Sequence, residues 1–420
     1  MGSFVRYQLG TVLILFQLGA GSAAAFSVTP IAHLSAVGGQ YFTGSTHSNG
    51  VNVDGSFVPV LGLTPTLYLI PIYLGSYHQT QSVYNFLGQN TLIQEQMDQT
   101  GVLRSAWAMN ANWRLKPRIG YTKEWIKQST DESLQNGLFN YTRAVSGISA
   151  ERVFGNGSLE IGYDRGMVRY PNYQSLLSDP RFTSTGITPL VGTNVLNFDS
   201  DESSLTYQIS SSDKRWNLSN VFTWVRENFV DQNIITTTVT SFPAESSDNK
   251  LRTDDIFNLI LQQGLRPSSR WSFNLGETIQ YYTSNQNSFD TAPVNVATPF
   301  TYRYYNFIET QLNPSITLFL DEARWDLTLA FNYGYRQYSH RRMQDGTGAN
   351  QDSLIHSMNR GTTLTFRYAI GRNSPHKWLK GLYATLTGNV LTYWSNTRFE
   401  GNYPYNYTVY TYLGGLSWDY

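Results

Sequence analysis

The sequence has no cysteine and little charge for its 420 residues. Without cysteine the chain forms no disulfide and offers no thiolate to a metal. Charged residues make up only 14% of the chain, whereas about 25% is usual in a soluble domain. Acidic and basic residues number 30 each, so the formal net charge is zero. This balance gives no electrostatic basis for a nucleic-acid partner, and we expect none.

Long apolar runs are also missing after the first thirty residues, so no transmembrane helix is expected in the rest of the chain. Residues 1–25 instead have the three parts of a secretory signal peptide. Arg6 supplies the positive start, an apolar core follows over 9–18, and the alanines at 23–25 fit the cleavage site. We therefore expect residues 1–25 to be removed and Phe26 to begin the mature chain.

The signatures of common enzymes are absent as well. The six histidines stand in no metal-ligand spacing. The sequence has neither a G-x-S-x-G elbow nor a phosphate-binding loop. We therefore expect no enzyme activity, no catalytic residues, no metal and no cofactor.

What the sequence does have is alternation between apolar and polar residues. It is clearest over the last thirteen residues, where large apolar or aromatic side chains recur at every second position, interrupted only by Gly414. They are Tyr410, Tyr412, Leu416, Trp418 and Tyr420. Alternate residues of a β-strand face opposite sides. The pattern therefore predicts a strand over 408–420 with one apolar face.

A second pattern is tryptophan placed just after a short polar connection, where it opens an alternating strand. Trp216, Trp271, Trp325 and Trp378 follow this pattern at spacings of 55, 54 and 53 residues. Trp113 shares the apolar face of a predicted strand over 103–115 with Leu103 and Trp107. Tryptophan at the boundary between lipid and water forms the aromatic girdle of membrane proteins. We expect Trp113 and the four repeated tryptophans to form such a girdle.

The terminal strand resembles the closing strand of bacterial outer-membrane β-barrels, which end in an aromatic residue preceded by alternating apolar ones. The resemblance covers the whole mature chain and rests on features general to such barrels. It fits the porin-like barrels of about this length that accompany exopolysaccharide genes. It implies an all-β, transmembrane, antiparallel up-and-down β-barrel of roughly 16 strands over residues 26–420.

The same resemblance implies a location and partners. The chain is expected in the outer membrane of a Gram-negative bacterium, in contact with outer-membrane lipid. The barrel-assembly machinery would read the terminal strand through Tyr410, Tyr412, Leu416, Trp418 and Tyr420.

Connections in such barrels are short on the periplasmic side and longer on the extracellular side. We place the short turns at Thr64, Lys116, Asn156, Ser212, Pro267, Asp321 and 371–376. We place the long loops at 44–56, 79–99, 129–138, 171–199, 230–252, 285–299, 341–353 and 397–404. Of these, 171–199 and 230–252 are candidates to fold into the lumen. Glu277 would face lipid in an unbroken strand, so we expect a β-bulge at Gly276 to reset the register.

Polar residues that alternate with the apolar ones are expected to line the lumen. The charged candidates are Arg104, Arg114, Glu160, Asp164, Glu309, Asp326, Arg336 and Arg367. A barrel of this size is not filled by its own side chains, so mixed charge suits a passive channel for small polar solutes. The alternatives are a conduit that exports polysaccharide with periplasmic partners, and a structural or adhesive barrel with ligand-binding loops. A hydrolase at the rim, built from His340, His356, Asp345 and Asp352, ranks last.

Overall fold

The computed structural model describes residues 26–44, 46–84, 91–127, 133–173, 194–235, 246–289, 300–398 and 406–420. The expected signal peptide, residues 1–25, lies outside these ranges. Long strands dominate the described part. They are β2 (Ala32–Thr43), β3 (Thr46–Phe57), β5 (Leu67–Tyr84), β6 (Thr91–Ala108), β7 (Trp113–Lys127), β8 (Tyr141–Phe154), β9 (Gly157–Arg169), β10 (Phe198–Ser210), β11 (Trp216–Ile235), β12 (Ser246–Leu265), β13 (Trp271–Ser284), β16 (Phe307–Leu320), β17 (Trp325–Gln344), β18 (Asn350–Ala369), β19 (Leu382–Ser395) and β20 (Tyr407–Asp419).

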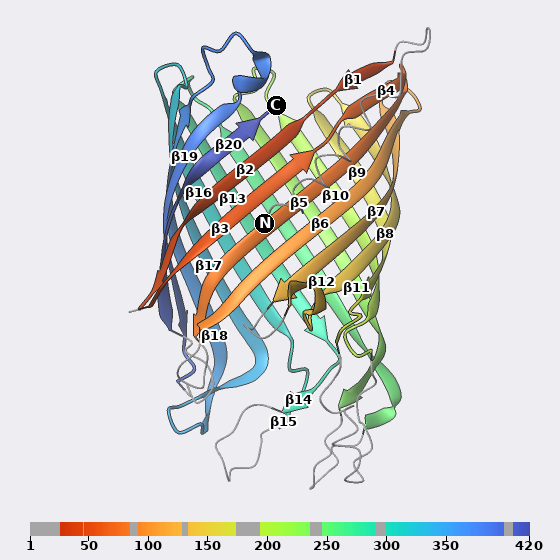
Figure 1. The fold of residues 1–420 in the computed structure, drawn as a ribbon. Coiled ribbons are helices and arrows are strands. Elements are labelled where there is room, and N and C mark those ends of the chain that lie inside the picture. Colours follow the sequence, from red (N-terminus) through yellow and green to blue (C-terminus); the bar gives the residue numbers. More distant parts are fainter. Residues whose placement is uncertain are drawn as a thin grey trace.

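These strands close into a ring. Each pairs antiparallel with the next in sequence, and β20 returns to pair with β2 from Asp419–His33 to Val409–Thr43. The wall is therefore a closed antiparallel barrel of 16 strands, as the sequence predicted. Figure 1 shows the strands tilted around the barrel, with the red N-terminal strands beside the blue β20. Closure gives each of the 16 described wall strands a partner on both sides.

Short strands extend the first two wall strands beyond a proline. β1 (Ser27–Thr29) precedes β2, and it pairs with β4 (Val60–Thr64), which follows β3. Pro30 and Pro59 lie at the two interruptions, because proline has no N–H to donate to the ladder. The N–H of Val58 donates to the carbonyl of Ile31 at 2.7 Å and holds the two halves together. Away from the wall, β14 (Ser288–Phe289) and β15 (Phe300–Thr301) form a separate small ribbon.

Alternation in the sequence becomes two faces of the wall. Large apolar side chains stay exposed on the outer face, as with Ile161 at 61% and Leu386 at 60%. In β20, Trp418 and Leu416 fall on this face, in register with Leu34 and Ala36 of β2. A closed strand wall with an apolar outer surface is the architecture of outer-membrane barrels, since every backbone group is paired within the wall. The described strands therefore have the architecture of a transmembrane β-barrel.

No helix among the described residues is both long enough and apolar enough to cross a membrane.

The two ends of the barrel differ in their connections. One end carries the turns 65–66, 109–112, 155–156, 211–215, 266–270, 321–324 and 370–381. We call it the short-turn end, and it holds both Ala32 and Tyr420, whose backbones exchange hydrogen bonds of 2.8 and 3.0 Å. The opposite end carries the longer connections, with β14 and β15 projecting there (Figure 1).

The turn predicted at Lys116 is wrong. β6 ends at Ala108 and β7 begins at Trp113. The side-chain oxygen of Asn110 closes the turn by accepting hydrogen bonds from the N–H groups of Asn112 at 2.9 Å and Trp113 at 3.0 Å. Pro117 lies inside β7, where the ladder to β6 is interrupted. The strand predicted over 103–115 is therefore parts of two strands, and Trp113 opens β7.

Several predicted loops are strands in the structure. Residues 46–57 form β3, so the loop predicted over 44–56 is wrong. Strands also extend well into the loops predicted over 79–99, 230–252 and 341–353. These segments are rich in polar residues, and so the alternation in the sequence fades. Most of 171–199 and 397–404 lies outside the described residues.

Two single-residue expectations are also corrected. The ladders on both sides of β13 run without a shift through Gly276 and Glu277, so the expected bulge is absent. Glu277 therefore shares the outer face with Leu275 and Ile279. Trp378 does not open a strand, because it lies in the 3-10 turn η3 (Lys377–Leu379) before β19. Trp216, Trp271 and Trp325 do open β11, β13 and β17, and their role in a girdle stays a prediction.

Candidate functional site

The inner face carries charged residues in clusters, the largest of them at the short-turn end on β6 to β9. Lys116 Nζ lies 2.6 Å from Glu160 Oε2 and 2.9 Å from Glu151 Oε2. Arg104 Nη2 donates to Glu160 Oε1 at 2.7 Å, although β7 and β8 lie between their strands. Side chains that meet across two intervening strands need the concave side of the wall. These residues therefore face the lumen. We call them the lower cluster, and the short-turn end that holds them is drawn at the top of Figure 1.

The lower cluster continues along the wall toward the other end. Arg118 donates through Nε to Asp164 Oδ1 at 2.6 Å and makes a second contact through Nη2, a bidentate geometry. Asp164 is almost fully buried. One strand on, Arg143 lies 3.6 Å from Glu202. Each of these acidic groups thus has a basic partner on a nearby strand.

A smaller ionic group crosses the seam between the last and first wall strands. Asp419 of β20 contacts Nδ1 of His33 on β2 at 2.6 Å. Its other carboxylate oxygen accepts a hydrogen bond from Arg367 Nη2 at 3.2 Å. Arg367 Nε also lies 3.8 Å from Asp326, so β17, β18, β20 and β2 are linked at the short-turn end.

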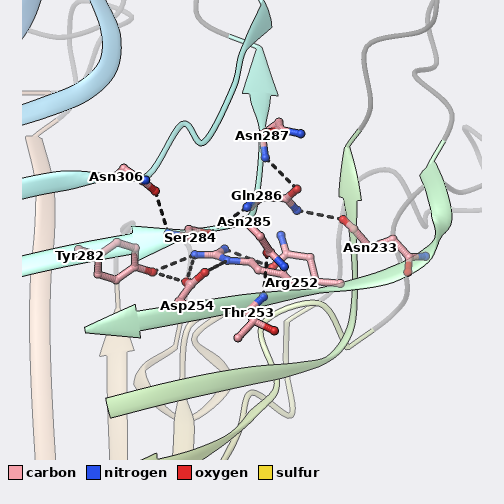
Figure 2. Close-up of polar contacts among 11 residues, drawn as sticks. Asn233, Arg252, Thr253, Asp254, Tyr282, Ser284, Asn285, Gln286, Asn287 and Asn306 are labelled. Atoms are coloured by element: carbon pink, nitrogen blue, oxygen red, sulfur yellow. Dashed lines mark hydrogen bonds and ion pairs between the residues drawn. The ribbon is translucent and has the colours of Figure 1, made fainter. Parts of the chain in front are cut away.

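A further cluster lies on the inner face near the long-connection end, and we call it the upper cluster. Figure 2 shows Arg252, Asp254 and Tyr282 turned toward one another. Arg252 Nε lies 3.0 Å from both carboxylate oxygens of Asp254, which is fully buried. The guanidinium is also sandwiched between the rings of Phe229 at 4.3 Å and Tyr305 at 4.5 Å. Nearby, Arg336 Nε donates to Glu309 at 2.6 Å.

The connection between β13 and β16 covers the upper cluster. Gln286 accepts from the N–H of Ile235 at 2.9 Å and donates to the carbonyl of Asn233 at 3.0 Å (Figure 2). Asn306 accepts from the N–H of Ser284 at 2.7 Å. The described parts of 285–306 are thereby held against the wall. Sequence reasoning proposed 171–199 and 230–252 as the segments that fold into the lumen. Most of 171–199 lies outside the described residues, and the described residues of 230–252 continue β11 and β12 as strand.

The structure groups the predicted lumen residues by wall segment. The lower cluster contains Arg104, Arg114, Glu160 and Asp164, and the seam contains Asp326 and Arg367. The pair Glu309–Arg336 lies near the long-connection end. Sequence reasoning missed Lys116, Arg118, Glu151, Arg252 and Asp254. Recognising Asn110 as a turn-closing residue would have placed Arg114, Lys116 and Arg118 on one face of β7.

Charged residues on the outer face form a different arrangement. In register across the wall, Arg165 pairs with Asp201 at 2.9 Å and Arg226 pairs with Asp255 at 2.9 Å. Arg226 follows Trp216 by ten residues on the same strand (226 − 216), which is about 25 Å along the barrel axis for a tilted strand. An apolar band of outer-membrane barrels is about 25 Å tall. This row of ion pairs therefore lies about one band height from Trp216 along the barrel axis.

Among the described residues, no group of three or more histidine, aspartate and glutamate side chains is arranged to hold a metal ion.

No family model and no curated protein matches the chain. Solved structures with a similar strand arrangement include a loop L8 deletion mutant of OmpT, an outer membrane protein of Vibrio cholerae. It is 10% identical, covers 94% of this chain and 100% of its own, and has a TM-score of 0.40. Pseudomonas aeruginosa OpdL is 11% identical over 94% and 99% of the two chains, with a TM-score of 0.38. A bacterial polysaccharide outer membrane secretin is 10% identical over 93% and 98%, with a TM-score of 0.38.

Proposed function

We propose that the chain is an outer-membrane channel through which small polar solutes pass passively. The observation that carries the proposal is the closed ring of 16 strands with ion pairs along its inner face. At 16 to 18 strands, wall side chains no longer fill the interior, and an aqueous channel remains. Charged side chains on the inner face are compatible with water in that channel.

The pairing of charges sets the expected selectivity. Arg104, Arg336 and Arg367 each have a carboxylate within 4 Å. Rings of one sign of charge make a pore selective, whereas locally balanced pairs give weak selectivity. We therefore expect a channel that distinguishes solutes by size more strongly than by charge sign.

Conductance in planar bilayers is the direct test. The reconstituted barrel is expected to give stable open-channel current. Arg336→Glu and Arg367→Glu each place a carboxylate beside an existing one, so selectivity should shift toward cations. Arg372→Glu is the matched control, because it makes the same charge change in the turn 370–381, beside Glu322 at 2.8 Å.

Size selection is tested by swelling of proteoliposomes in neutral sugars of increasing length. Uptake should fall steeply once the sugar no longer fits the lumen. Correctly folded protein that is silent in bilayers and causes no swelling would overturn the proposal.

A further inference from the structure

The inner wall at the short-turn end contains a hollow of about 490 Å³. Ala106 and Ala108 of β6 line it, and their short side chains leave space that longer residues would fill. Tyr68 and Ile70 of β5 border one side, and Arg114 and Lys116 of β7 border the other. Small-molecule sites commonly measure about 300–1,000 Å³, so the hollow has the size of a ligand site.

The two sides of the hollow differ in chemistry. The β5 side presents the Tyr68 ring and the Ile70 side chain, with Val60 beside them. The β7 side presents cations, and Arg104 of β6 adds a third. An aromatic and aliphatic surface on β5 therefore lies opposite a positively charged one on β7, with the short side chains of Ala106 and Ala108 on β6 between them.

Positive charge exceeds negative charge around the hollow. Among the described residues, Arg104, Arg114 and Lys116 form ion pairs with two carboxylates, those of Glu151 and Glu160. Lys116 is already engaged in ion pairs, because its ammonium group contacts both carboxylates and its side chain is only 13% exposed. One of the three cationic groups is thus left without a carboxylate of its own.

Two guanidinium groups have capacity for a further acceptor. The Arg114 side chain is 48% exposed and reaches Glu151 through Nη1 alone, at 3.3 Å. Arg104 donates to Glu160 through Nη2 at 2.7 Å, and its side chain is 26% exposed. A guanidinium carries five N–H donors, so both residues can donate to a further anion.

We infer that the hollow binds a small organic carboxylate that carries an apolar or ring-shaped face. The carboxylate accepts charge-assisted hydrogen bonds from Arg114 and Arg104, while the ring packs on Tyr68 and Ile70. This inference rests on the proposed channel, for which it names a preferred solute class. A neutral solute lacks the first interaction, and a short carboxylate such as acetate lacks the second.

Calorimetric titration of the purified barrel in detergent tests the inference with three probes. Benzoate has both the charge and the ring, acetate has only the charge, and benzyl alcohol has only the ring. Benzoate is expected to bind roughly tenfold more tightly than either of the others, since each partial probe loses one interaction. Equal affinity for the three probes, or no binding of benzoate, would overturn the inference.

Paired variants locate the site. Arg114→Gln should weaken benzoate binding roughly tenfold, because a charge-assisted contact is lost. Ala106→Leu should remove binding by filling the hollow. Arg372→Gln removes one cation at the same end, and Ala330→Leu adds the same volume to the inner face of β17. Both controls should bind benzoate like the unaltered protein, and a loss as large as that of the paired variant would contradict the assignment.

Conduction separates this inference from the proposed function. A barrel that conducts but shows no preference for benzoate keeps the channel and loses the site. A barrel that binds benzoate at the hollow but stays silent in bilayers keeps the site and loses the channel. Heat-modifiable migration of each variant shows that it has folded before either measurement is read.

Discussion

The Arg104–Glu160 pair of the lower cluster and the Arg252–Asp254 pair of the upper cluster are both ion pairs of an arginine with a carboxylate, but they differ in their access to water. In the lower cluster, the Arg104 and Glu160 side chains keep 26% and 21% of their exposed area. In the upper cluster, Arg252 and Asp254 keep 10% and 0%. The described parts of the connection between β13 and β16 cover the upper cluster, whereas the lower one borders a hollow. The covering connection, rather than the residue types, thus makes the upper ion pair buried and leaves the lower one partly exposed to water.

The largest effect is expected from Asp254→Asn. The substitution leaves Arg252 buried without its carboxylate, and breaking a buried ion pair in this way costs about 3–5 kcal/mol. Urea unfolding in lipid vesicles, followed by tryptophan fluorescence, measures the loss. Asp352→Asn is the control, because its fully exposed carboxylate contacts Arg342 only at 3.6 Å. If the two variants lose equal stability, the buried Arg252–Asp254 pair does not stabilise the barrel more than an exposed ion pair does.

Glu160→Gln should have a smaller effect on stability. Its carboxylate accepts from Arg104 and Lys116, but Glu151 still holds Lys116 and water reaches the site. We expect a loss of about 1–2 kcal/mol in the same unfolding experiment, the size of one hydrogen bond to a charged group. The lumen also gains net positive charge, so bilayer currents should become more anion-selective. A loss as large as that of Asp254→Asn would remove the distinction between the clusters.

The smallest effect is expected at an exposed carboxylate of the long-connection end. The hydroxyl and N–H groups of Thr347 hold the pKa of Asp345 below its usual range. Because the folded pKa is lowered, this stabilisation is present above the unfolded pKa and is lost as the pH falls through the folded pKa. Within the acid range in which pepsin is active, cleavage of the turn 345–349 should therefore increase as the pH falls through the folded pKa of Asp345.

Cleavage sites read by mass spectrometry follow this opening. In Asp345→Asn the turn should be equally cleavable at all pH values at which pepsin acts, with global unfolding unchanged. An acid-dependent opening that persists in this variant would assign the effect to another group.

The sequence predicted those features that depend on contact with lipid. Trp418 and Leu416 fall on the apolar outer face of β20, and Trp216, Trp271 and Trp325 open strands after short turns, as predicted. The sequence did not predict features that depend on register or on strand length outside the apolar band. Pro117 was mistaken for a turn, and the polar ends of β5 and β17 were mistaken for loops.

The sequence also did not predict which side chains contact one another on the inner face of the wall. Arg104 and Glu160 were both predicted to line the lumen, but their contact depends on the curvature that brings β6 and β9 together. Arg252 and Asp254 were missed because a polar segment concealed the strand that carries them. The register of each strand fixes such pairs, and a one-residue error in a turn is enough to lose them.

The seam between β2 and β20 has a consequence for the order of folding. His33 and Asp419 are in contact although they lie 386 residues apart in the sequence. A contact between such distant residues forms only after the intervening strands have brought the two ends together, so it is among the slowest to appear. Until then β2 remains an open edge, available to any other strand. Substitutions at the seam therefore act first on the rate at which the barrel closes and on its losses to aggregation.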